Sequence, residues 1–345
     1  MVMAAMPAEP SRLSRRPLRL ASGAALCLAT SFGLGWSLPV VAPVLGLFVI
    51  ASLDRPLPLK AGLGLALVVM LTTGSGLLLL PFLRYYWFSG VLLTGLLLFL
   101  AFRYGLRGGN NLVSTFLAAG LTMISAAGTA DFGLAVTVIG ALVKGLLLAV
   151  LALAVVHWLF PEPAGGRPAR AAQVLPHSVA DWMALRAALV VMPAFLLALS
   201  DPAAYLPIIM KSVSLGRQSC TTARGAAREL LGSTLFGGLL AILFWSALSL
   251  FVHLWMFFLW MLLFVLVAGR KLYAISPTRY PPGFWLNSLV TMVILLGQSV
   301  QDSAAGKDVF TAFAVRMGLF VGVTLYACLM LWLMDKPGRI SLRAP

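Results

Sequence analysis

Long apolar runs separated by short polar connections dominate this chain of 345 residues. A helix needs about 20 mainly apolar residues to cross the hydrocarbon core of a bilayer. Only 10% of the residues are charged and 61% are hydrophobic, whereas about 25% are charged in an average soluble domain. The pattern predicts an all-α polytopic membrane protein with about twelve transmembrane helices. The segments lie at about 18–36, 39–53, 61–83, 88–104, 111–128, 132–159, 184–200, 203–215, 229–249, 251–269, 284–300 and 309–334.

The second and eighth segments are shorter than the others and begin near Pro39 and Pro207. Proline lacks the backbone N–H that a helix interior uses. We therefore expect these two segments to form half-buried or broken helices.

The basic residues indicate an orientation in the membrane. If the N-terminus is cytoplasmic, Arg84 and Lys307 face outward, Lys144 and Arg316 lie within segments, and the other 21 of the 25 Lys and Arg residues face the cytoplasm. Such an excess of basic residues marks the cytoplasmic side. We expect an inner-membrane protein with both termini cytoplasmic. Because topology explains the net charge of +15, no nucleic-acid partner is expected.

An internal repeat follows from positions that recur 167 or 168 residues apart. The anchors are Arg19 with Arg186, Pro39 with Pro207, Lys60 with Arg228, and Arg103 with Arg270. They predict two six-helix membrane repeats, residues 1–160 and 183–345, joined by a cytoplasmic linker rich in proline and glycine at 161–182. An even number of segments in each repeat makes the two copies parallel, with a pseudo-twofold axis along the membrane normal.

Three sequence features carry a family resemblance. They are the helix start Leu18-Arg19-Leu20-Ala21, the second segment opening with Leu38-Pro39, and the turn Gly105-Leu106-Arg107-Gly108-Gly109-Asn110. With the doubled six-helix unit, the chain resembles the fusaric acid resistance and aromatic acid exporter (FUSC-like) superfamily, particularly its compact DUF2955-type branch. The resemblance implies efflux of aromatic or other organic acids, often beside a periplasmic adaptor of the membrane-fusion (HlyD-like) type.

Polar residues recur at matched depth in the fifth segment of each repeat. Ser114 and Ser125 align at an offset of 173 with Asn287 and Gln298, and Thr291 lies on the same stripe as the latter two. These side chains are candidates for lining a substrate path. Hydrogen bonding between helices is the structural alternative, because Ser, Thr, Asn and Gln commonly bond across helices in membrane bundles.

Two cations lie inside apolar segments. Lys144 follows Asp131 by 13 residues, or roughly 20 Å of helix, near the bilayer centre, where a charge costs at least about 2.5 kcal/mol. We expect Lys144 to face the bundle interior or a water-filled cavity and to bind a substrate carboxylate; a neutral or structurally paired lysine is the alternative. Arg316 is a second substrate-binding candidate, although it could extend to the membrane surface.

Asp131 and Asp308 stand at the outer start of the last segment of each repeat. Acidic residues stabilise helix N-termini, so capping explains both. Proton coupling is the functional alternative, because an outward-facing carboxylate near a cation can change its protonation during transport.

The function expected from these features is export of organic, aromatic or amphipathic, carboxylate anions by a proton-coupled secondary transporter. Cytoplasmic basic residues would attract the anion: Lys211, Arg217, Arg224 and Arg228. A passive anion channel and a non-transporting membrane component of an adaptor-containing efflux complex are the alternatives. We expect the lipid bilayer, the anion and further copies of the chain as partners. Since His and Cys lack metal-ligand spacing and no catalytic constellation occurs, no metal, cofactor or enzymatic activity is expected.

Overall fold

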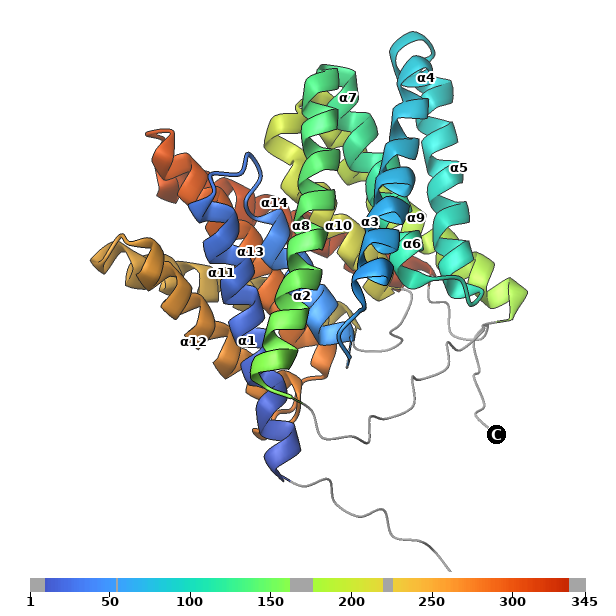
Figure 1. The fold of residues 1–345 in the computed structure, drawn as a ribbon. Coiled ribbons are helices and arrows are strands. Elements are labelled where there is room, and N and C mark those ends of the chain that lie inside the picture. The colour runs from blue at the N-terminus through green and yellow to red at the C-terminus, as the bar shows by residue number, and fades with distance from the viewer. Residues whose placement is uncertain (1–9, 54, 162–175, 220–225, 335–345) are drawn as a thin grey trace, which may run out of the picture. The chain divides into compact units, whose positions relative to one another are not determined.

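The computed structural model describes residues 10–53, 55–161, 176–219 and 226–334, and within these ranges the chain forms helices and short connections, without strands. The helices are α1 (Pro10–Gly33), α2 (Val41–Ser52), α3 (Leu59–Gly74), η1 (Ser75–Leu79), α4 (Leu80–Tyr85), α5 (Trp87–Leu106), α6 (Asn111–Ala119), η2 (Gly120–Ile124), α7 (Ser125–Ala130), α8 (Phe132–Leu159), α9 (His177–Ser200), α10 (Pro202–Ser219), α11 (Ala226–Leu250), α12 (Leu254–Leu272), α13 (Pro282–Ala304) and α14 (Val309–Met334) (Figure 1). The predicted all-α class is confirmed for these residues.

Each predicted apolar segment overlaps a helix or a continuous stretch of helices. Two stretches combine several elements: α3, η1 and α4 run on into one another, as do α6, η2 and α7. Within the described ranges, nine stretches are long and apolar enough to cross a membrane, and α1, α2 and α10 are not among them. The chain is a multi-pass membrane protein, and the full number of twelve crossings stays a prediction.

The two short segments differ from each other. Helix α2 has 12 residues and is largely buried, as predicted for a half-buried helix. Helix α10 runs unbroken through Pro207 for 18 residues, so the alternative of a broken helix is wrong there. Pro207 lies close to the start of α10, where the φ angle of proline suits a helix and only one backbone hydrogen bond is lost.

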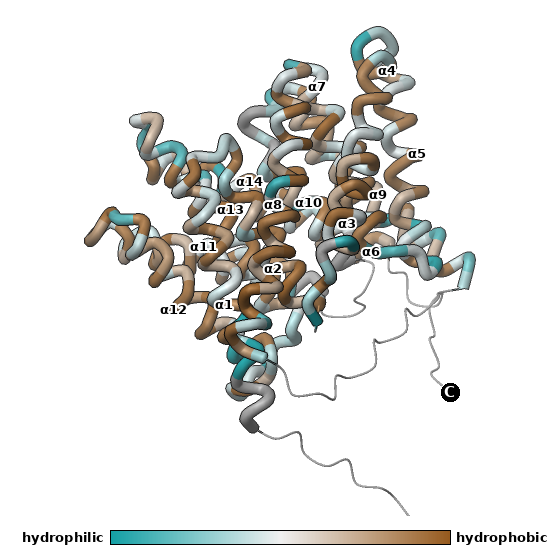
Figure 2. Tube along the Cα trace, viewed as in Figure 1, coloured by the Kyte–Doolittle hydropathy of each residue, from teal (hydrophilic) through white to brown (hydrophobic). Residues whose placement is uncertain are grey.

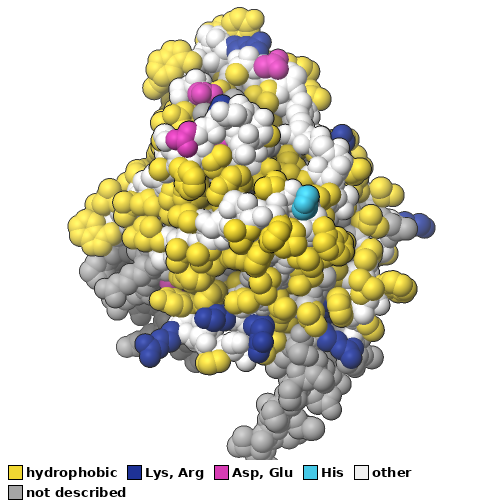
Figure 3. Space-filling model, turned by 90° about the vertical axis from the view of Figure 1, so that its left-hand side faces the viewer, with side chains coloured by type: hydrophobic (Ala, Val, Ile, Leu, Met, Phe, Trp, Pro, Cys, Tyr) yellow, Lys and Arg dark blue, Asp and Glu magenta, His cyan; other side chains and the backbone are white. Residues whose placement is uncertain are grey.

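The surface is rich in large apolar side chains. Large apolar side chains are exposed on α3, α5, α8, α9, α11, α12 and α14. Hydrophobic residues run along the helices, and hydrophilic residues mostly gather near their ends (Figure 2). Hydrophobic side chains cover much of the face drawn in Figure 3. A soluble protein rarely exposes so large an apolar surface, whereas lipid solvates it.

The described chain divides into two compact units. Unit 1 comprises residues 1–63, 144–170 and 236–305, and therefore contains α1, α2, α12, α13 and the later parts of α8 and α11. Here α1 runs alongside α12 (Figure 1), with the ring of Phe32 edge-on to that of Phe257 at 5.0 Å between centroids. Helix α2 packs against α13, and a Cβ atom on Gly297 would overlap the side chain of Val40.

Unit 2 comprises residues 64–143, 171–235 and 306–345, and contains most of α3, the stretch from η1 to α7, and α9, α10 and α14. Helix α9 packs against both α10 and α5. Gly216 of α10 lies close to α9, because a Cβ atom there would be 3.0 Å from Val191 and 3.3 Å from the carbonyl oxygen of Ala187. Small residues at such places let helix backbones approach closely in a membrane.

The compact units do not coincide with the two halves of the sequence. In unit 1 the first helix of the first half packs on α12 from the second half, and in unit 2 the first helix of the second half, α9, packs on α5 from the first half. Under the predicted offset of about 167 residues, α1 corresponds to α9 and α5 to α12. The first helix of each half therefore packs on an equivalent partner helix of the other half, so the exchange of helices between the halves is reciprocal. The repeat at 1–160 and 183–345 itself stays a prediction. The predicted linker at 161–182 is too long at its end, since α9 begins at His177.

Candidate functional site

Two helical stretches are far more buried than the rest. In the spanning window of Asn111–Ala130 72% of the residues are buried, and in that of Pro282–Ala304 78% are, against 28–50% for the other seven spans found in the described ranges. The first stretch belongs to unit 2 and the second to unit 1. They are the fifth segments of the two predicted repeats, which the sequence singled out for their polar residues.

In unit 2 the predicted polar residues are buried and bonded to backbone. The Ser114 hydroxyl donates to the carbonyl of Ala101 on α5 at 2.7 Å, and the Ser125 hydroxyl donates to the carbonyl of Leu121 in its own stretch. A further buried hydroxyl, on Thr122, donates to the carbonyl of Ala118 at 2.7 Å. Only the Ser114 contact joins two helices, as the structural alternative expects; the hydroxyls of Ser125 and Thr122 bond within their own stretch.

The same stretch departs from α-helical geometry at η2, a π-helical turn from Gly120 to Ile124. Gly120 meets Gly76 of η1 backbone to backbone, because a Cβ atom on Gly76 would overlap the carbonyl oxygen of Gly120. Single π-helical turns inside helices frequently accompany functional sites. Hydropathy alone could not reveal this turn, because its residues are as apolar as their neighbours.

In unit 1 the polar stripe of α13 is mostly buried. Asn287 and Thr291 are buried, Gln298 is half-buried, and Asp302 in the last turn is 4% exposed. The Thr291 hydroxyl donates to the carbonyl of Asn287 at 2.8 Å. The backbone of α11 lies against this stripe, since a Cβ atom on Gly237 would be 2.7 Å from the Cβ atom of Thr291.

The two cations predicted to bind substrate belong to different units, Lys144 to unit 1 and Arg316 to unit 2. Lys144 is exposed on α8, on the same stripe as the exposed Leu147 and Leu151. Lys144 is thus not buried among the helices, and the prediction that it faces the bundle interior or a water-filled cavity stays a prediction. An ammonium group this far along a spanning helix still needs water or an anion beside it. Arg316 is half-buried on α14.

Asp131 and Asp308 both cap helices. The Asp131 carboxylate accepts hydrogen bonds from the backbone N–H groups of Gly133 (3.1 Å) and Leu134 (3.0 Å) at the start of α8. Asp308 accepts from the Thr311 hydroxyl and from the backbone N–H of Phe310. These hydrogen bonds, that of Thr311 first, hold the pKa of Asp308 below its ordinary value of 3.8. The geometry agrees with the capping alternative for both residues.

The structure also buries three cations that were counted among the cytoplasmic basic residues in the prediction from sequence. Arg186 of α9 is 3% exposed, Arg19 of α1 is 4% exposed, and Lys211 of α10 is fully buried. Arginine and lysine are rarely buried without a partner, and all three make polar contacts. The predicted exposure of Lys211 in a cytoplasmic basic cluster is wrong. Arg224 lies outside the described residues, and so do the side chains of Arg217 and Arg228. The recurrence of Arg19 as Arg186 was the sequence feature that could have indicated a structural role for these two arginines.

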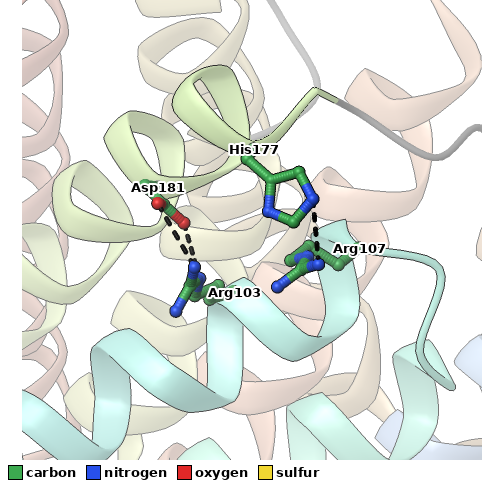
Figure 4. A network of polar contacts seen from close by, with 4 residues as sticks. All are labelled: Arg103, Arg107, His177 and Asp181. Atoms are coloured by element: carbon green, nitrogen blue, oxygen red, sulfur yellow. Dashed lines mark hydrogen bonds and ion pairs between the residues drawn. The ribbon is translucent and has the colours of Figure 1, made fainter.

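A polar network joins the end of α5 to the start of α9 in unit 2 (Figure 4). Arg103 Nε lies 2.6 Å from Asp181 Oδ1, and Arg103 Nη2 donates to Asp181 Oδ2 at 3.4 Å. One turn away on each helix, Arg107 Nη2 lies 3.1 Å from His177 Nε2. The sequence analysis missed this network because it assigned residues 177–182 to the linker. His177 and Asp181 are four residues apart, and this spacing could have indicated that both side chains lie on one face of a helix.

The described ranges hold no group of three or more His, Cys, Asp and Glu side chains placed to bind a metal ion. Comparisons with curated proteins and with solved structures give no match. One family comparison does match, over the region of the first predicted repeat. Residues 16–156 match the family model described as "Protein of unknown function (DUF2955)".

Proposed function

We propose that this chain is a secondary transporter of the inner membrane that exports organic anions, aromatic or amphipathic carboxylates, in exchange for protons, with both termini in the cytoplasm. The observation that carries the proposal is the contrast in burial among the spanning stretches. Each compact unit encloses one stretch that is more than 70% buried, and both stretches contain polar side chains. Transporters commonly place substrate and ion sites near the bilayer midplane, on irregular helices of their repeats.

Polar side chains on these two stretches would line the anion's path. Ser114 and Ser125 in one unit, and Asn287, Thr291 and Gln298 in the other, are the candidates. The hydroxyls of Ser114 and Ser125 already donate their hydrogen atoms to carbonyl oxygens. They therefore cannot donate to the anion as well and would contribute mainly to the shape of the path. Asn287 and Gln298 carry amide donors, which suit a carboxylate, and are the stronger candidates.

Lys144 would hold the carboxylate of the substrate. It lies 12 residues into the 28-residue helix α8, about 18 Å from its outer end, and its side chain is exposed. A cation at this depth costs at least about 2.5 kcal/mol in lipid, and a bound anion would offset that cost. Arg316 of α14, in the other unit, stays a separate substrate-binding candidate with a fixed charge, because arginine stays protonated.

Proton coupling would use a carboxylate on the path. Asp131 and Asp308 are exposed caps at the outer ends of α8 and α14, where the periplasmic pH reaches them. Asp302 is the acidic residue that is buried among the described side chains, and it extends the polar stripe of α13. We therefore add Asp302 to Asp131 and Asp308 as a candidate proton carrier.

Transport into proteoliposomes tests the proposal. Vesicles holding the purified chain would be given radiolabelled benzoate or succinate under an imposed pH gradient, and separately under an imposed voltage of the same driving force. Because neutral benzoic acid crosses lipid unaided, we expect benzoate to accumulate with the pH gradient faster in these vesicles than in protein-free vesicles. Accumulation that follows voltage alone would establish the channel alternative instead, and absence of movement under both would overturn transport of these anions.

The Lys144 assignment is tested with Lys144→Met. The matched control is Lys307→Met, which removes an exposed lysine between α13 and α14. We expect Lys144→Met to abolish benzoate transport while the protein elutes as the wild type does in gel filtration, and Lys307→Met to transport normally. Unchanged transport by Lys144→Met would remove this residue from the mechanism while leaving transport itself standing.

A further inference from the structure

An apolar groove runs along the outside of unit 2 between α5 and α9. Its volume is about 630 Å³, and its walls include Leu92 and Leu96 of α5 and Leu185 and Leu189 of α9, all of which are 38–59% exposed. Small residues hollow it: Gly95 and Ala188 line it. The groove does not involve the buried polar stretches of the proposed path.

The length of the groove matches one leaflet together with its head-group region. It extends along α9 from Ser178 to Met192, which is about 21 Å of helix. Half of a bilayer of about 40–45 Å, head groups included, is about 20–22 Å. Trp182 lines the groove at its Asp181 end, and tryptophan gathers where hydrocarbon meets head groups. The groove therefore reaches from a membrane interface to the middle of the bilayer.

Two arginines stand beside the interface end of the groove without lining it. Asp181 lines it and is paired with Arg103, and His177 contacts Arg107 one turn away (Figure 4). Arg103 and Arg107 carry two positive charges and Asp181 carries one negative charge, so these three side chains have a net positive charge even when His177 is counted as neutral. Arg103 is 32% exposed and Arg107 is exposed, so both can also reach a ligand in the interface. Ser178 supplies a hydroxyl at the same end.

We propose that this groove binds an anionic phospholipid, with one acyl chain between α5 and α9 and the phosphate beside Arg103 and Arg107. The apolar walls, the leaflet-long reach and the cationic end together fit this amphiphile. A zwitterionic lipid would fit the walls equally well but would gain less from the charges. Asp181 then has a second role: it holds Arg103 in place and lowers the net charge that the head group meets.

Lipid retention measured by native mass spectrometry tests the site. The full chain, purified in detergent, would be titrated with phosphatidylglycerol or with phosphatidylcholine carrying the same acyl chains. Gly95→Leu would fill the groove, since a Cβ atom there would meet Met192 at 3.5 Å, an ordinary contact distance. Gly318→Leu is the matched control, because Gly318 is exposed on α14 with no atom within 4 Å of an added Cβ atom.

We expect preferential retention of phosphatidylglycerol by the wild type and by Gly318→Leu, and loss of that preference in Gly95→Leu. Charge variants give an independent test that does not depend on filling the groove. Arg103→Gln should weaken phosphatidylglycerol binding and Asp181→Asn should strengthen it, each about fivefold, as expected for one charge near a membrane surface.

Three results would overturn the site. One is equal retention of the two lipids by the wild type. Another is weakening by both Arg103→Gln and Asp181→Asn, which would mean that the ion pair is purely structural. The third is a wild-type dimer that Gly95→Leu converts to a monomer without changing lipid retention, which would place a second copy of the chain in the groove.

Discussion

The contact between Gly76 and Gly120 supports a quantitative prediction about packing in unit 2. The two glycines let η1 and η2 meet backbone to backbone, and a Cβ atom on Gly76 would overlap the carbonyl oxygen of Gly120. A backbone carbonyl cannot rotate away as a side chain can, so Gly76→Ala must separate the two elements. Overpacking of this kind typically costs 1–3 kcal/mol.

The opposing effect of the substitution is smaller. Alanine loses less conformational entropy than glycine when a helix forms, which favours it by roughly 0.5–1 kcal/mol. The net expectation for Gly76→Ala is therefore destabilisation by about 0–2.5 kcal/mol, or about 1 kcal/mol at the middle of the range. Gly318→Ala provides the control, because it lies in the same unit and its added Cβ atom would meet nothing within 4 Å. Only the entropic gain applies there.

Thermal unfolding of the two variants in the same detergent, followed by circular dichroism, measures the difference. We expect Gly76→Ala to melt at a lower temperature than the wild type, and Gly318→Ala to melt at the same temperature or slightly higher. If Gly76→Ala melts with or above Gly318→Ala, the close approach of η1 and η2 does not exist in the folded protein, and the reasoning fails.

Three further predictions follow from named contacts. Because the pKa of Asp308 is lowered in the folded state, its ionised carboxylate stabilises the fold above the ordinary pKa of 3.8, and this stabilisation is lost as the pH falls towards the lowered pKa. Between pH 6 and pH 3 the melting temperature of Asp308→Asn should therefore fall less than that of the wild type. Equal falls in the two melting temperatures would contradict the capping contacts. Residues 1–160 and 176–345, which keep α9 whole, should each be degraded when made separately but should co-purify when expressed together, since each compact unit needs helices from both. A stable isolated half in membranes would refute the exchange. Gly237→Ala should lower the melting temperature because its Cβ atom would lie 2.6 Å from the carbonyl oxygen of Ser288, whereas a melting temperature equal to that of Gly318→Ala would contradict the contact of α11 with α13.

Much of the helical structure could be predicted from local sequence. The predicted segments 132–159 and 309–334 begin at the same residues as α8 and α14, because an aspartate precedes each apolar run and caps the helix. The special burial of the fifth segments could also be anticipated, since their polar residues are poorly suited to contact with lipid. The structure buries Asn287, Thr291, Ser114 and Ser125 alike, and the hydroxyls of the two serines bond to backbone carbonyls.

The sequence by itself determined which residues are helical and that they lie in a membrane, because both follow from hydropathy and capping within short windows. Only the tertiary structure decided which helices meet: α1 with α12, and α9 with α5. It also decided that Lys211 is buried and Lys144 exposed. The physical reason is that lipid solvates an apolar helix face about as well as another helix does. Helix pairing therefore depends on small residues and close backbone contacts, which hydropathy does not record.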